Sequence, residues 1–213
     1  MAHSVLRSAL VLGLLSTVGP FSIDMYLPAM PAIGLDLGSD VAATQATLTA
    51  FFLAFGLAQL IYGPWADQAG RKPPIYAGMV IFILAAVGCA LAPTIGWLTV
   101  FRFIQGLGAA AVMVIPRAII RDQHTGTQAT RMMALIMLVI SISPMLAPLV
   151  GSGVPMLGNW RLLFWVLCVV GLFFDGTAPP MVAAIALCAV AAMGLALLVL
   201  PRLAVSQATA LRP

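Results

Sequence analysis

The stretch FSIDMYLPAMP, residues 21–31, ends the first long apolar run of the chain and places a carboxylate, Asp24, inside that run. The run covers residues 5–27, and a helix needs about 20 apolar residues to cross roughly 30 Å of hydrocarbon. A charged side chain in such a segment is costly and usually faces a bundle interior or an aqueous cavity. Pro20 and Pro28 each lie four residues from Asp24, which predicts an interrupted helix here.

The composition extends this reading to the whole chain. Of 213 residues, 62% are apolar and 8% are charged, and the mean hydropathy is +1.11. A soluble core of this size needs far less apolar surface, whereas a protein whose outside faces lipid needs this much. The chain is therefore predicted to be all-α, a polytopic transmembrane helix bundle in a lipid bilayer. The further apolar runs are residues 43–62, 74–91, 97–120, 132–150, 160–174 and 181–200.

Basic residues lie between the apolar runs and predict the orientation of the chain. The positive-inside rule places the N-terminus and the connections after the second and fourth runs in the cytoplasm, because these carry the Lys and Arg residues. The connection after the first run carries Asp36 and Asp40 instead. Arg161 breaks the pattern, and we expect it to snorkel at an interface beside Trp160. No dense basic patch forms despite a net charge of +4, so no nucleic-acid partner is predicted. The cytoplasmic basic residues are Arg7, Arg71, Lys72, Arg117, Arg121 and Arg131.

Small residues recur every four positions on two of the expected helices. Such stripes let the backbones of membrane helices approach closely, and they support a compact bundle without indicating an activity. On the second stripe, two prolines lie one turn apart and should bend the helix. The stripes are Ala50, Ala54 and Ala58, and Ser143, Ala147 and Gly151, with the prolines at Pro144 and Pro148.

The connection GPWADQAGRK, residues 63–72, fits the pattern G-x-x-x-D-x-x-G-R-[RK]. Its glycines, Gly63 and Gly70, would allow a tight turn between two spans. Asp67 can pair with a nearby arginine or accept hydrogen bonds at a helix N-terminus, and Arg71 and Lys72 supply positive charge. The alternative is an ordinary basic cytoplasmic turn.

The segment RFIQGLG places Arg102 inside the run 97–120. Arg102 and Gln105 are three residues apart and share a helix face, while Gly106 and Ala110 offer a smooth surface to a neighbouring helix. Asp24 lies at a matching depth, so it is expected to share a polar, water-containing cavity with Arg102. The alternatives are an arginine that snorkels and a carboxylate solvated at the interface.

Neither a metal site nor an enzyme active site is predicted. Cys89, Cys168 and Cys188 each lie within an apolar run without CxxC spacing, so packing is the default interpretation. His3 and His124 are not near a candidate nucleophile, a ligand cluster or a nucleotide-binding loop. We expect no cofactor.

Four blocks in this order resemble the Bcr/CflA-type drug:proton antiporters of the major facilitator superfamily. The resemblance covers about residues 10–172, and it implies multi-pass insertion in a bacterial inner membrane. The implied activity is efflux of small amphiphilic drugs, such as bicyclomycin-like or chloramphenicol-like compounds, in exchange for protons. The blocks are SIDMYLPAMPAI (22–33), GPWADQAGRKP (63–73), RFIQGLGAAAVMVIPRAIIRD (102–122) and SPMLAPLVG (143–151).

The resemblance also implies roles for individual residues. Asp24 and Arg102 would line the central cavity for protons and drug, with Gln105 beside them. The loop through Asp67 and Arg71 would belong to the cytoplasmic gate. Pro144, Pro148 and Gly151 match the antiporter motif, in which Ser152 replaces the usual last glycine.

The length of the chain departs from the family, whose fold has two six-helix halves with the substrate site between them. Residues 1–172 resemble the N-terminal six-helix half, and residues 173–213 resemble the loop and last helix of the second half. An internal deletion is the simplest explanation. Residues 160–174 either cross the membrane or, as we slightly favour, dip without crossing, because a helix of this length rises only about 22 Å. A second chain would be needed to complete the cavity, and the alternative is a fragment or structural subunit without transport of its own.

Overall fold

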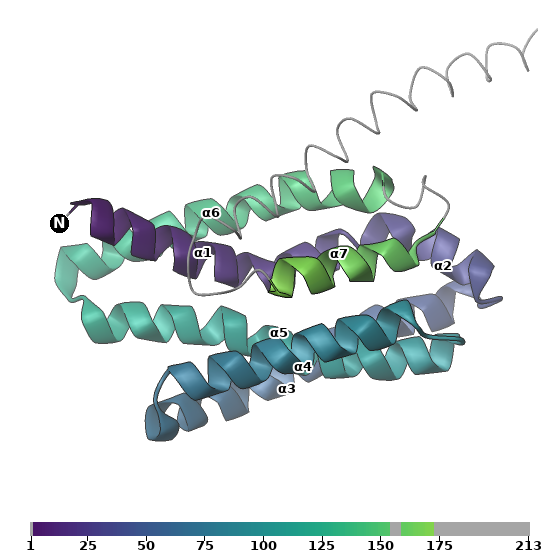
Figure 1. Ribbon diagram of the computed structural model, residues 1–213, viewed down its shortest axis with the longest axis horizontal. Helices are drawn as coiled ribbons and strands as arrows, with labels where there is room; N and C mark the ends of the chain where they lie inside the picture. Colours follow the sequence, from purple (N-terminus) through teal and green to yellow (C-terminus); the bar gives the residue numbers. More distant parts are fainter. Residues whose placement is uncertain (1, 154–158, 173–213) are drawn as a thin grey trace, which may run out of the picture.

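A computed structural model describes residues 2–153 and 159–172, and all its elements in these ranges are helices joined by short turns (Figure 1). The predicted all-α transmembrane bundle is confirmed in this part of the chain, whereas the run at 181–200 lies outside the described residues. The elements are α1 (Ala2–Asp24), the 3₁₀ turn η1 (Leu27–Ala29), α2 (Met30–Asp36), α3 (Val41–Ala69), α4 (Lys72–Ala90), α5 (Ile95–Gln123), α6 (Gly126–Gly153) and α7 (Arg161–Leu172).

Five helical segments in the described residues are long and apolar enough to cross a membrane. One is the broken segment Val11–Asp36, which contains most of α1, the turn η1 and α2, and the others are α3, α4, α5 and α6. Helix α7 has 12 residues and therefore rises about 18 Å, which is less than the thickness of the hydrocarbon layer. The expectation that this segment does not cross stays a prediction.

The helices run side by side, so the bundle has two ends (Figure 1). At the end that we call the Asp36 end, α2 is followed by α3, α4 is followed by α5, and α7 begins. At the opposite end, the Asp67 end, α3 is followed by α4 and α5 by α6.

The predicted interruption beside Asp24 is confirmed. Helix α1 ends at Asp24, and Pro28 lies in the 3₁₀ turn that connects it to α2. Two later helices, α3 and α5, begin at side-chain caps. The Asp40 carboxylate accepts a hydrogen bond from the Ala43 amide at 2.7 Å at the start of α3, and Thr94 caps α5 in the same way.

Glycines let α5 approach its two main neighbours, α3 and α4. A Cβ atom added to Gly108 would lie 2.5 Å from both the Gly78 carbonyl oxygen and the Phe82 amide nitrogen of α4. A Cβ added to Gly106 would overlap the Phe51 carbonyl of α3. The smooth surface predicted at Gly106 is therefore confirmed, and these crossings place Arg102 at the centre of the bundle.

The second small-residue stripe packs α6 against α1. Ser143, Ala147 and Gly151 are all buried, and the Gly151 backbone lies so close to the Met25 carbonyl that a Cβ would overlap it. Close backbone packing is what such stripes permit in membranes. On α3, the first stripe is buried at Ala54 and Ala58.

Candidate functional site

Arg102 is completely buried in the middle of the bundle. Its guanidinium carbon lies 4.3 Å from the centroid of the Tyr26 ring, 4.5 Å from that of Phe51 and 6.0 Å from that of Phe164. These rings come from the turn after α1, from α3 and from α7, so the cation joins segments that are far apart in the sequence. Aromatic faces attract a desolvated cation through their quadrupoles, by about 2 kcal/mol.

Gln105 is the polar partner of Arg102. Arg102 Nη1 donates to Gln105 Oε1 at 2.9 Å, and both residues are 0% exposed. The predicted shared helix face is therefore confirmed. Arg102 Nε and Nη2 and Gln105 Nε2 have no hydrogen-bond partner, so this buried cluster contains three unused donor atoms and attracts a hydrogen-bond acceptor.

Tyr26 is held in place by its own hydroxyl. Tyr26 Oη and Thr47 Oγ1 lie 2.5 Å apart, and Thr47 Oγ1 donates to the Thr44 carbonyl at 2.6 Å. The Thr47 proton is thus used within α3, and Tyr26 is the donor of the shared hydrogen bond. This bond fixes the face of the ring against Arg102. The sequence analysis missed Tyr26 and Phe51, although an aromatic residue two positions after Asp24 was a usable signal.

Asp24 does not pair directly with Arg102, and the expected water-containing cavity shared by the two residues stays a prediction. Asp24 Oδ2 is buried without a hydrogen-bond partner, and no ion pair forms between Asp24 and Arg102. The reason is the turn that follows α1, which brings the Tyr26 ring rather than the carboxylate onto the guanidinium. Asp24 shares a helix face with Thr17 and Phe21, which line a small cavity of about 70 Å³ between α1 and α6.

The predicted gate loop lies at the Asp67 end and contains a bridging arginine. Arg71 donates from Nη1 to Asp67 Oδ1 and from Nε to Asp122 Oδ2, each at 2.7 Å. It thereby links the end of α3 to the end of α5. These hydrogen bonds, above all the one to Asp122, raise the pKa of the Arg71 guanidinium, which stays charged. Asp122 was not predicted as part of this loop.

The glycines of this loop have different roles. Gly70 has a φ of 85°, in the left-handed region, and makes the turn between α3 and α4. Gly63 lies within α3 and not in the turn, so that part of the prediction is wrong, because the helix continues to Ala69. No atom lies within 4 Å of a Cβ added at Gly63. Lys72 is the first residue of α4.

The antiporter motif lies on α6, which continues as one helix through Pro144 and Pro148. Both prolines are exposed, whereas Gly151 is buried against the turn after α1. The motif therefore packs beside the residue that follows Asp24, Met25. This contact joins α6 to the break in the first span.

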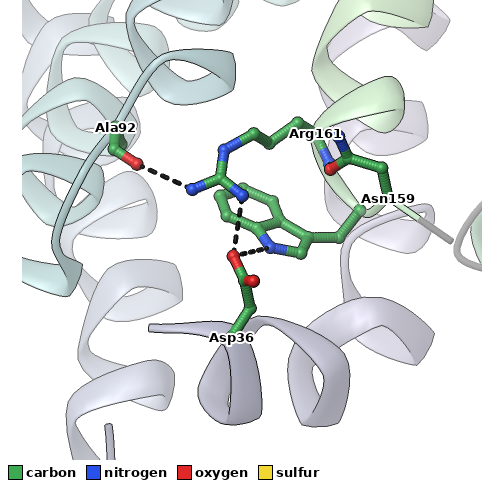
Figure 2. A network of polar contacts seen from close by, with 5 residues as sticks. Asp36, Ala92, Asn159 and Arg161 are labelled. Carbon is green, nitrogen blue, oxygen red and sulfur yellow. Dashed lines mark hydrogen bonds and ion pairs between the residues drawn. The ribbon is translucent and has the colours of Figure 1, made fainter. Parts of the chain in front are cut away.

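A second polar cluster lies at the Asp36 end (Figure 2). Asp36 Oδ2 accepts hydrogen bonds from Trp160 Nε1 at 2.9 Å and from Arg161 Nη1 at 2.7 Å. Arg161 Nη2 also donates to the Ala92 carbonyl at 3.2 Å, and the guanidinium carbon lies 4.4 Å from the Trp160 ring centroid. Arg161 therefore ties α7 to α2 and to the connection between α4 and α5. Arg161 lies beside Trp160 and also forms a cross-link that the sequence analysis missed, while its snorkelling at an interface stays a prediction.

Comparison with known proteins supplies the family. Residues 12–175 match the sequence profile of the Major Facilitator Superfamily. This chain belongs to that superfamily. As a superfamily member, it is a multi-pass membrane protein of a family of transporters rather than enzymes.

Curated superfamily members share substantial identity with the chain. It is 39% identical over 168 residues to the uncharacterized MFS-type transporter YdgK of Bacillus subtilis, covering 78% of the chain and 42% of that protein. It is 37% identical over 163 residues to the bicyclomycin resistance protein homolog of Haemophilus influenzae, covering 76% and 41%. It is 35% identical over 152 residues to the multidrug resistance protein MdtL of Escherichia coli, covering 71% and 39%. The chain thus spans about two fifths of the length of these relatives.

Proposed function

We propose that this superfamily member takes part in the efflux of small amphiphilic drugs in exchange for protons. The observation that carries the proposal is the pair of ionisable groups in the membrane interior, Asp24 at a helix break and Arg102 in a buried aromatic enclosure. Ionisable residues within membrane spans are rare and mark substrate or proton pathways. The names of the relatives from H. influenzae and E. coli, which refer to bicyclomycin and multidrug resistance, support the substrate class.

Asp24 is the proposed proton carrier. It carries a buried carboxylate oxygen without a partner, and it ends the helix where η1 begins. A proton on this group would remove the cost of a buried charge, so its binding favours the conformation in which Asp24 is buried. Arg102 is proposed to supply the fixed positive charge of the transport cavity. Together, Arg102 and Gln105 offer three unused donor atoms to a hydrogen-bond acceptor.

The exposed face of α3 is the proposed wall of the transport cavity. Thr49 and Gln59 are exposed on this helix, and polar side chains are unfavourable against lipid. Gly56 lies on the same face with no atom within 4 Å of an added Cβ. We propose that a second six-helix lobe, supplied by another chain, covers this face and completes the cavity.

The proposed orientation places the Asp67 end in the cytoplasm of a bacterium and the Asp36 end outside the inner membrane. The basic residues at the Asp67 end support it through the positive-inside rule. In this orientation Asp67, Arg71 and Asp122 form the cytoplasmic gate, and the α6 motif of Pro144, Pro148 and Gly151 packs near the outer end of α1. The loop and last helix expected in residues 173–213 lie outside the described residues.

The second candidate is a fragment or structural subunit without transport of its own, because one lobe alone supplies a single wall of a two-lobed cavity. Drug resistance and dye efflux in a pump-deleted host expressing the chain separate the two candidates. The host is tested with the chain alone and with the chain plus the remaining C-terminal part of the H. influenzae relative. The proposal is supported if efflux occurs in either setting and the Asp24→Asn variant abolishes it.

The matched control is Asp40→Asn, because Asn caps a helix as well as Asp does and Asp40 lies near the same end. Efflux should survive this change. If the Asp24→Asn variant and the unchanged chain give equal efflux, the proposed role of Asp24 is overturned. No efflux in both settings overturns the transport proposal itself and leaves the structural subunit.

A further inference from the structure

A pocket of about 520 Å³ lies at the Asp36 end, between α2 and the first turns of α3. It is separate from the cluster around Arg102, because none of its lining residues belongs to that cluster, which consists of Arg102, Gln105, Tyr26, Phe51 and Phe164. Its volume is in the range of small-molecule sites, which are about 300–1,000 Å³. The exposed side chains of Leu35 and Val41 are among its lining residues, so the pocket opens at the surface.

The lining has the composition of a site for an amphiphile. Its apolar wall includes Leu27, Met30 and Pro31, and its polar residues are Ser39, Thr44 and Gln45. None of the lining residues is ionisable. A few polar groups set in an apolar wall fix the orientation of a small ligand, while the wall contributes most of the buried area.

The polar side of the pocket is preorganised. Thr44 Oγ1 donates to the Asp40 carbonyl at 2.9 Å, so the bond of 3.0 Å between Ser39 and Thr44 takes its proton from Ser39. The Ser39 amide also donates to the Gly34 carbonyl at 2.9 Å. Gln45 is exposed, and its amide forms no hydrogen bond with any other described residue. It is therefore free to donate to a ligand and to accept from one.

The cluster of Asp36, Trp160 and Arg161 anchors the wall of the pocket that α2 forms, and it leaves this wall without net charge. Asp36 ends α2, the helix that supplies Met30, Pro31 and Leu35 to the pocket. Its carboxylate is paired with Arg161 and bonded to Trp160 (Figure 2). A paired carboxylate offers a ligand no net negative charge, so nothing in the lining compensates the cost of desolvating a charged ligand.

We propose that this pocket binds a neutral amphiphilic small molecule, with its apolar body against α2 and a hydrogen-bonding group at Gln45. The pocket thereby adds a second binding site to the chain, at the end opposite the gate loop. This inference extends the proposed efflux function but does not depend on Asp24. Acyl chains of lipids are the competing occupant of the same apolar wall.

Photolabelling of the full chain in lipid nanodiscs tests the proposal. The probes are a neutral benzophenone amide and its trimethylammonium counterpart of equal length, and labelled peptides are mapped by mass spectrometry. We expect saturable labelling by the neutral probe within residues 27–45. The cationic probe should label these residues at least about tenfold less, because the pocket has no group to pair with its charge.

Two pairs of variants provide matched controls. Val41→Trp fills the pocket and should abolish saturable labelling, whereas Ala46→Trp adds the same bulk at an exposed position of α3 outside the pocket. Gln45→Leu removes the hydrogen-bonding group and should weaken labelling roughly fivefold to tenfold. Gln68→Leu makes the same change at an exposed position of α3 outside the pocket and should leave the labelling unchanged.

Three results overturn the proposal: equal labelling by both probes, labelling that does not saturate, or labelling that Val41→Trp leaves unchanged. Labelling that spreads over all exposed helix faces identifies lipid chains as the occupant. The Asp24→Asn variant separates this inference from the efflux proposal, since it should keep the labelling even where efflux is lost. Helix content measured by circular dichroism confirms that each variant folds.

Discussion

The guanidinium of Arg102 lies over the ring of Tyr26, with 4.3 Å between the guanidinium carbon and the ring centroid. The two residues come from the middle of α5 and from the break after α1, and they are 76 positions apart in the sequence. The contact places the positive charge of Arg102 among aromatic rings rather than next to a carboxylate. A charge held in this way is costly for folding, which suggests that it is kept for function.

The first prediction concerns the charge of Arg102. Arg102→Met keeps much of the side-chain volume and removes a buried charge that lacks an ion-pair partner. We expect the free energy of unfolding to stay the same or rise by up to about 2 kcal/mol, while efflux is lost. Thermal unfolding in detergent and the efflux assay check it. Arg102→Ala leaves a cavity and should lower the unfolding free energy by about 2–5 kcal/mol. A large loss of stability in Arg102→Met would show that the charge itself stabilises the fold.

The second prediction concerns the hydroxyl of Tyr26. Tyr26→Phe removes the hydrogen bond to Thr47 but keeps the ring over Arg102. We expect the free energy of unfolding to fall by about 1 kcal/mol, the usual contribution of a buried hydrogen bond. The control is Tyr62→Phe, which removes a hydroxyl with no hydrogen-bond partner among the described residues and should change stability by less than about 0.5 kcal/mol. Equal effects of the two changes would contradict a bracing role for this hydrogen bond.

The third prediction concerns the crossing of α4 and α5. Gly108→Ala places a Cβ 2.5 Å from the Gly78 carbonyl oxygen, and the contact is with backbone that cannot turn aside. We expect a loss of about 3 kcal/mol or more in unfolding free energy, measured by thermal unfolding in detergent. Gly56→Ala, at a helix position with no atom within 4 Å, should instead raise stability by about 0.5–1 kcal/mol. A fully stable Gly108→Ala protein would mean that the helices are further apart than this structure has them.

The fourth prediction concerns the attachment of α7. Asp36→Ala removes the acceptor shared by Trp160 and Arg161, so the amides of α7 should exchange with solvent roughly tenfold faster. Hydrogen–deuterium exchange read by mass spectrometry measures this effect. Asp67→Ala also removes a carboxylate bonded to an arginine, but at the opposite end, and should leave α7 unchanged. Unaltered exchange in Asp36→Ala would show that apolar packing alone holds α7.

Particular residues show how far local sequence information reached. Arg102 and Gln105 were predicted to share a helix face, and their hydrogen bond follows from the helix period. Asp67 and Arg71 are four residues apart, which also places them within reach of each other. By contrast, the partners lie on other elements: Asp122 on α5, Phe51 on α3 and Tyr26 in the turn after α1. Local spacing carries no information about them.

Asp24 and Gly63 show two limits of local sequence information. Depth in the membrane was estimated from sequence position, and it placed Asp24 level with Arg102. Depth does not specify the direction of a side chain around the helix axis, and the turn after α1 directs Tyr26 inward instead. Gly63 was assigned to a turn by its motif, although only Gly70 has the positive φ that a turn requires.

By itself, the sequence determined that this chain is a bundle of membrane helices, that the first span is interrupted beside Asp24, and that Arg102 lies within another span. The physical reason is that hydrocarbon excludes unpaired backbone groups and therefore dictates the length and composition of each span. Only the tertiary structure decided which groups meet: Arg102 with three aromatic rings, Arg71 with Asp122, and Arg161 with Asp36. These contacts depend on how the helices are rotated about their own axes. That rotation is set by the close backbone approaches at Gly106, Gly108 and Gly151, where several helices must fit together at once.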